Sequence, residues 1–168
     1  YSRGLRANIE NTEMIIGDYD VNARGSGDMY YKGHNMLHTL RQMINDDGKW
    51  REILRGLNRD FYHQVVTSRQ VEEYIAEKTG LPLGPFFDQY LRDIRIPVLE
   101  YWARDAKLIY RWANCLETFA APVDIYIDGK KTRIKPTTGF QIMDLSTPTA
   151  EIAVDPDYYV YSYNLYGN

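Results

Sequence analysis

Proline is absent from the first 81 residues of this 168-residue chain, and this distribution limits the fold more than any other feature of the sequence. All prolines follow residue 81: Pro82, Pro85, Pro97, Pro122, Pro136, Pro148 and Pro156. Because proline removes a backbone donor and breaks helix interiors, long helices are compatible with the stretch before residue 82 but not with the stretch after it. The chain is therefore predicted to be an α+β protein in two segregated parts, a helical part at residues 1–95 and a β-rich part at 96–168.

The first part carries helix signals in four stretches, after an irregular lead-in at residues 1–27 that ends in the Gly-rich segment 22–27. Helices are predicted at about 28–45, 50–61, 67–80 and 83–93, where apolar residues recur at helical spacing. The stretches begin or end at residues typical of helix boundaries: Asp28 as an N-cap, Asp46-Asp47-Gly48 as a break, Thr67 with Gln70 as a capping box, and Gly80 at a helix end. This pattern indicates an array of helical hairpins.

The second part alternates apolar and polar residues with the period of two that is typical of strands. Strands are predicted at 98–102, 108–112, 123–127, 130–134, 140–143, 151–154 and 158–161. Tight turns are predicted at Arg104–Lys107 and at Asp128-Gly129, and the second is a strong hairpin signal. Short strands at this spacing predict a small antiparallel Ig-like β-sandwich. The tyrosines between Tyr158 and Tyr166 indicate either strand packing together with a terminus that contacts another domain, or a binding surface.

Composition and charge exclude several classes of protein. The chain has 20 Lys+Arg against 23 Asp+Glu, so it lacks the positive excess of a protein that binds nucleic acid through bulk charge. No apolar run approaches the ~18 residues that a membrane span requires. The lone Cys115 excludes an internal disulfide and a thiolate metal cluster. The first residue is Tyr1 rather than Met, which predicts a processed product or a piece of a longer protein.

Few side chains suggest chemistry by their spacing alone. His34 and His38 are four residues apart on the first predicted helix, which is the spacing of two zinc ligands. A zinc-peptidase helix has glutamate directly after the first histidine, but here Asn35 follows, and no third ligand is identifiable. We therefore interpret both histidines as surface or inter-helix residues. His63 is interpreted as structural or exposed, and Cys115 as an inert thiol.

Short motifs in a definite order carry a family resemblance. Residues 28–45 read DMYYKGHNMLHTLRQMIN and contain Tyr-x-Lys-Gly at Tyr30, Lys32 and Gly33. FFDQYL follows at 86–91 and IPVLEY at 96–101. Together they resemble the M1 family of zinc metallopeptidases, the gluzincin aminopeptidases, over nearly the whole chain. The resemblance implies the C-terminal part of the helical catalytic domain at 1–95, followed by the β-sandwich domain at 96–168.

The resemblance also implies an activity and a catalytic residue. Enzymes of this family hydrolyse N-terminal peptide bonds with a zinc-activated water, and the tyrosine of the motif stabilises the oxyanion of the intermediate. Tyr30, three residues before Gly33, has this register, whereas Tyr31 does not. A tyrosine hydroxyl is a neutral donor near pH 7 and suits this role. Lys32 and Gly33 are expected to be supporting residues, Lys32 in a surface or inter-domain charge pair and Gly33 in close helix packing.

The zinc-binding motifs of the family do not occur in this sequence. The H-E-x-x-H helix, the glutamate that is the third ligand and the G-x-M-E-N segment all precede the tyrosine in the family. We therefore expect no metal ligand and no zinc in this chain, and no activity of the chain alone; zinc and the peptide substrate would be bound by the parent enzyme. The alternative is a non-catalytic scaffold or protein-interaction module derived from the same family. A dimer can form in either case, through surface that a missing neighbour would cover.

Overall fold

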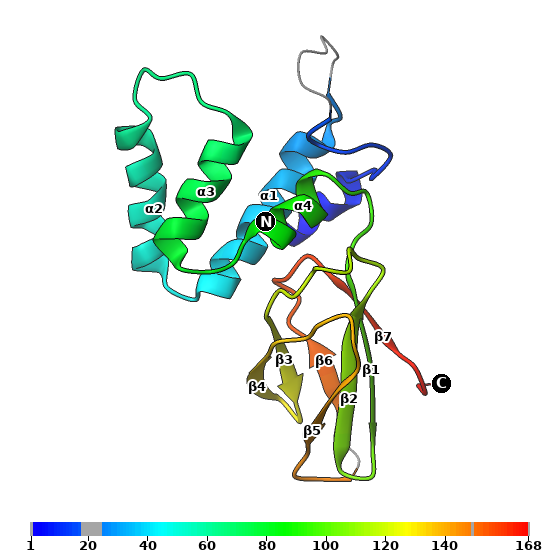
Figure 1. Cartoon of the computed structure of the whole chain (residues 1–168). Helices are drawn as coiled ribbons and strands as arrows, with labels where there is room; N and C mark the ends of the chain where they lie inside the picture. Colours follow the sequence, from blue (N-terminus) through cyan, green and yellow to red (C-terminus); the bar gives the residue numbers. More distant parts are fainter. Residues whose placement is uncertain (1, 18–24, 149, 168) are drawn as a thin grey trace.

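The computed structural model describes residues 2–17, 25–148 and 150–167, with helices at one end of the molecule and strands at the other (Figure 1). The helical part contains the 3-10 helix η1 (Ser2–Asn8) and the α-helices α1 (Asp28–Ile44), α2 (Asp47–Asp60), α3 (Ser68–Thr79) and α4 (Gly84–Leu91). The α-helices confirm the predicted ones, whereas η1 has no predicted counterpart. Residues 1 and 18–24 of the predicted lead-in lie outside the described residues. In the described ranges, no helix has the length and apolarity needed to cross a membrane.

Local capping explains where α2 and α3 begin. The Asp46 carboxylate accepts a hydrogen bond from the backbone N–H of Lys49 at 2.9 Å. Thr67 and Gln70 form the predicted reciprocal capping box, in which the Thr67 N–H donates to Gln70 Oε1 at 2.8 Å. Gly80 ends α3 with a φ of 72°, a conformation that glycine adopts without a Cβ penalty. These predicted boundaries are confirmed. They could be predicted because each depends only on residues that are neighbours in the sequence.

The N-cap predicted at Asp28 is wrong. The capping position is Gly27, and Asp28 is the buried first residue of α1. Its carboxylate accepts hydrogen bonds from the backbone N–H groups of Glu10 and Asn11, at 2.9 and 2.7 Å. Ser26 Oγ accepts the N–H of Asp28 itself, at 3.1 Å. The carboxylate of Asp28 is therefore bound by the backbone of the segment before α1. It still lies at the N-terminal end of the helix, where negative charge is favourable.

The strands form two sheets that share one core. The first contains β1 (Val98–Arg104), β2 (Lys107–Ala113), β5 (Gln141–Asp144) and β7 (Tyr161–Asn164), in the order β5-β2-β1-β7. The second contains β3 (Val123–Ile127), β4 (Lys130–Ile134) and β6 (Ile152–Val154), in the order β4-β3-β6. Buried side chains of both sheets, such as Leu108 and Ile125, belong to the same hydrophobic cluster. The α+β class, with helices first and strands second, is confirmed.

Both predicted hairpin turns are present. Asp105 and Ala106 join β1 to β2 with φ values of 52° and 57°, and Asp128 and Gly129 join β3 to β4 with φ values of 49° and 78°. Consecutive positive φ values define a type I′ turn, whose twist matches that of paired strands. The Asp128 carboxylate also accepts the N–H of Glu151 at 2.8 Å, which ties the second turn to the start of β6.

The last strand differs from the prediction in position and in direction. The strand predicted at 158–161 is replaced by β7, which begins at Tyr161 and pairs with β1 in parallel. The four-stranded sheet is therefore mixed, not antiparallel as predicted. Tyr158 and Tyr159 precede β7 and are buried, because they insert between the helices and the sheets and make hydrogen bonds there. These tyrosines pack between the two parts of the chain, whereas those of β7 are exposed.

Candidate functional site

Tyr30, the predicted catalytic residue, lies in the first turn of α1 and is 68% exposed. The adjacent Tyr31 is only half-exposed, because successive residues of a helix point about 100° apart. A tyrosine that belongs to the hydrophobic core is largely buried. Packing against the described residues therefore does not explain why a tyrosine stands at position 30. Its side chain is therefore accessible to a ligand or to another protein segment.

Lys32 lies two residues further along α1 and is fully buried. Its Nζ donates a hydrogen bond to the main-chain carbonyl of Asp93 at 2.8 Å, which joins α1 to the segment after α4. Burial lowers the pKa of Lys32, and the charges of Asp28 and Asp93 act in the opposite direction. Lys32 is therefore not at the surface, because its ammonium group is held inside the helical part; the other expected arrangement, an inter-domain charge pair, stays a prediction. This contact fixes the turn of α1 from which Tyr30 projects.

Gly33 follows Lys32 and is half-buried. A Cβ atom at this position would come no closer than 4.0 Å to its nearest neighbour, the carbonyl oxygen of Asp28. This is an ordinary van der Waals distance. Among the described residues, no close helix approach requires glycine here, and the supporting role of Gly33 stays a prediction.

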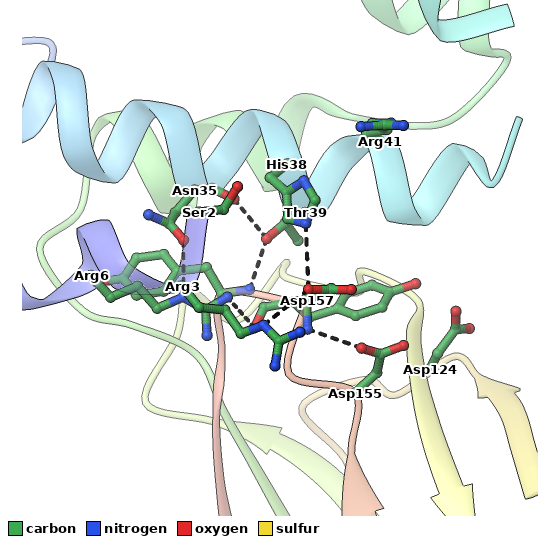
Figure 2. Close-up of polar contacts among 12 residues, drawn as sticks. Ser2, Arg3, Arg6, Asn35, His38, Thr39, Arg41, Asp124, Asp155 and Asp157 are labelled. Carbon is green, nitrogen blue, oxygen red and sulfur yellow. Dashed lines mark hydrogen bonds and ion pairs between the residues drawn. The ribbon is translucent and has the colours of Figure 1, made fainter. Parts of the chain in front are cut away.

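His34 and His38 both contact segments outside α1. The Nε2 of His34 lies 2.8 Å from the hydroxyl of Ser2 in η1. The Nε2 of His38 lies 3.6 Å from Asp157 Oδ1, which Arg3 approaches to 3.3 Å (Figure 2). These contacts agree with histidines that lie between elements. In the part of the chain that the structure describes, no three His, Cys, Asp or Glu side chains are grouped so that they could hold a metal ion.

His63 and Cys115 have the environments expected of residues without catalytic roles. His63 follows α2, is exposed, and packs edge-to-face against Tyr62 with 4.1 Å between ring centroids. Cys115 follows β2 and is half-buried. Burial raises the pKa of its thiol, which keeps the group protonated and poorly nucleophilic. The interpretation of His63 as exposed is confirmed, and the environment of Cys115 agrees with an inert thiol.

A polar junction, not foreseen from the sequence, joins the helical part to the strands. The hydroxyl of Thr39 accepts the N–H of Tyr159 at 2.8 Å, and the hydroxyl of Tyr90 donates to the carbonyl of Tyr159 at 2.6 Å. Arg6 donates to the carbonyl of Tyr158 at 3.0 Å. Burial raises the pKa of Tyr159 to about 12 and that of Tyr90 further, so both hydroxyls stay protonated. The partners are 69 to 152 residues apart, so no local pattern indicates them.

Arg133 on β4 connects the junction to the end of α1. Its guanidinium group pairs with Asp124, with 2.7 Å between Nε and Oδ1. It also donates to the carbonyls of Met43 and Gln42, at 2.8 and 2.7 Å. Carbonyls in the last turn of a helix lack intrahelical partners, and a cation is favourable there. Arg133 therefore fixes α1, the helix that carries Tyr30, against the strands.

Comparisons with known proteins identify a fold. No family model matches the chain, and no curated protein matches it. Among solved structures, aminopeptidase A of Legionella pneumophila in complex with aspartic acid is similar, with a TM-score of 0.63 and 15% sequence identity. The match covers 84% of this chain and 18% of that one. The chain thus has the fold of part of an aminopeptidase and spans less than a fifth of the length of that structure.

Proposed function

We propose that this chain is part of an M1-like zinc aminopeptidase that hydrolyses N-terminal peptide bonds. The observation that carries the proposal is the exposed Tyr30 on a helix turn anchored by the buried Lys32, in a chain whose fold is similar to part of an aminopeptidase. The Tyr-x-Lys-Gly, FFDQYL and IPVLEY motifs support the same family. Residues 1–95 would be the C-terminal part of the catalytic domain, and 96–168 the β-sandwich domain.

In this proposal Tyr30 donates a hydrogen bond to the oxyanion that forms when the peptide carbonyl is attacked. A donor that is already in place stabilises developing charge without reorganisation during the reaction. The buried side chains of Asp28 and Lys32 provide that placement, because they bind the backbone at residues 10–11 and the carbonyl of Asp93. Asp28 and Lys32 are therefore positioning residues, and Tyr30 is the group that contacts the reacting atoms.

Zinc chemistry is not assigned to residues of this chain. A bound zinc ion supplies an activated water in such enzymes. The described residues do not fit a zinc site, because they contain no group of three ligands, and His34 and His38 contact Ser2 and Asp157 instead. We therefore propose that other parts of the parent enzyme hold the ion. On this basis the chain alone is inactive and binds no stoichiometric zinc.

Two experiments test the proposal. Sequencing the gene upstream of the codon for Tyr1 should reveal an H-E-x-x-H motif followed by a further glutamate; absence of that motif would favour the non-catalytic scaffold. The isolated 168-residue chain should contain no zinc by metal analysis and should not hydrolyse an aminoacyl anilide. Metal-dependent turnover by the isolated chain would contradict the assignment of the zinc site to other parts of the enzyme.

A further inference from the structure

The outer face of the four-stranded sheet carries several exposed apolar side chains, and the proposed function does not use it. Trp102 on β1 packs edge-to-face against Phe140 and Tyr166, with 5.3 and 5.6 Å between ring centroids. The exposed large apolar side chains around it are Phe140, Ile142, Tyr161, Tyr163 and Tyr166. Patches of this kind mark interaction surfaces in soluble proteins.

β7, at one border of this face, is an edge strand without the usual protection. Among the described strands it is the last in its sheet (Figure 1). All of its residues are exposed. Residues 158–167 contain neither a charged residue nor a proline. Natural edge strands are commonly protected by lysine, proline or a bulge, because an open edge pairs readily with another strand. The free edge of β7 is therefore open to pairing with another strand.

The pairing of β7 with β1 determines which backbone N–H and C=O groups of β7 point to its free edge. The N–H groups of Tyr161 and Leu165 donate to carbonyls at β1, at 2.9 and 2.8 Å. Backbone groups of successive strand residues point to opposite sides, so those of Ser162 and Asn164 point to the free edge. The carbonyl of Asn164 accepts a long bond from Gly167, 3.4 Å, and retains a second lone pair. Two residues with donors and acceptors thus face outward.

We propose that β7 pairs antiparallel with β7 of a second copy of this chain. A two-fold axis at Tyr163 places Ser162 opposite Asn164 of the second copy, and each such pair exchanges two backbone hydrogen bonds. The same surface serves both copies, as a two-fold dimer requires. The four-stranded sheet of each copy then continues across the interface into the other.

Side chains and charges on the outer face favour this arrangement. The two copies of Tyr163 lie directly opposite each other in a non-hydrogen-bonded pair, where Cα atoms are about 4.5 Å apart and side chains are in close contact. Tyr163 is in register with Glu100, which is paired with Arg111 at 2.8 Å. Since residues 158–167 carry no charge, the interface brings no like charges together.

The surface area that the proposed dimer would bury is that of a weak dimer. Tyr161, Tyr163 and Tyr166 are 58%, 60% and 77% exposed, and burying a whole aromatic side chain removes about 150–250 Å² from water. These side chains on both copies together supply at most roughly 600–1,000 Å², which is below a standard interface and in the range of weak, transient ones. The dimer is therefore expected to form at micromolar or higher concentration.

Sedimentation velocity of the 168-residue chain tests the proposal. With rising concentration the mass should increase from 19.7 kDa toward twice that value. Tyr163→Lys and Tyr163→Glu should each be monomeric, because like charges would face each other at the two-fold axis. An equimolar mixture of the two variants should dimerise. A wild-type chain that stays monomeric, or a mixture that does, overturns the proposal.

Ile142→Lys is the matched control, because Ile142 is exposed on the same face but lies on β5, at the opposite edge of the sheet. This variant should dimerise like the wild type; loss of its dimer would indicate stacking of outer faces and would overturn edge pairing. In a Cys115→Ser background, Tyr163→Cys should form a disulfide-linked dimer on mild oxidation, whereas Ser162→Cys should not. The reverse result contradicts the proposed register.

Discussion

Replacing Arg133 by methionine tests how the helical part and the strands are held together. The guanidinium group pairs with Asp124, whose side chain is 5% exposed, and binds carbonyls at the end of α1. Removing one partner of a buried ion pair leaves the other charge uncompensated and costs about 3–5 kcal/mol. Lys131 Nζ still lies 3.3 Å from Asp124 Oδ2. We therefore expect a loss at the lower end of this range, about 3 kcal/mol in the free energy of unfolding.

Urea unfolding followed by circular dichroism measures this loss. With a denaturant slope of about 1–3 kcal/mol per molar urea, the expected change lowers the unfolding midpoint by roughly 1–3 M. Arg111→Met is the matched control, because Arg111 pairs with Glu100 at 2.8 Å on the outer face, where such pairs contribute about 0–1 kcal/mol. Equal effects of the two substitutions would refute the reasoning that the buried junction stabilises the fold.

The effect of Arg133→Met should also depend on pH. Burial by itself would raise the pKa of Asp124, but the hydrogen bonds and charge of Arg133 outweigh it, and the pKa lies below its ordinary value. A carboxyl group with a lowered pKa in the folded state stabilises the protein above its unfolded-state pKa, about 3.9 for aspartate, and this stabilisation is lost as pH falls through the folded-state value. The difference in stability between wild type and variant should therefore be largest near neutral pH and shrink below pH 4. A difference that stays constant from pH 7 to pH 3 would contradict the role of Asp124.

Two further substitutions test local packing in the helical part with the same unfolding assay. Thr67→Ala removes the hydroxyl that caps α3 and should cost about 1 kcal/mol, whereas Thr67→Ser should stay close to wild type. Equal midpoints for these two variants would argue against the cap. Gly56→Ala places a methyl group against the hydroxyl of Tyr74, which should cost about 1–3 kcal/mol and be offset in part by the higher helix propensity of alanine, about 1 kcal/mol. Adding Tyr74→Phe should recover much of that loss, and no recovery would show that the contact lies elsewhere.

Features that depend on neighbouring residues could be predicted from the sequence. Thr67 and Gln70 cap α3 as predicted because the capping box needs only residues three positions apart. The Asp128-Gly129 turn forms because its backbone angles suit these residue types. The absence of proline before residue 82 also correctly predicted where the longer helices α1, α2 and α3 lie, because the effect of proline on helices is local, and Pro85 is tolerated in the first turn of α4.

Features that depend on distant partners could not be predicted. Asp28 has the character of an N-cap, but N–H groups 17 and 18 residues earlier bind its carboxylate. Lys32 carries a charge typical of a surface residue, yet the carbonyl of Asp93, 61 residues away, holds it inside. The parallel pairing of β7 with β1 likewise joins opposite ends of the β-rich part. For the candidate site, the sequence indicated Tyr30, and the structure adds its accessibility and the anchoring of its helix turn.

The catalytic role that we propose for Tyr30 is tested most directly by the turnover number of the proposed parent enzyme that carries Tyr30→Phe. Loss of one oxyanion donor lowers kcat by about 10²–10³-fold in enzymes of known mechanism, and we predict a fall of this size with little change in KM. Tyr31→Phe, which removes the hydroxyl of the adjacent half-exposed tyrosine, should leave kcat close to that of the wild type. An unchanged kcat for Tyr30→Phe would contradict the proposed mechanism.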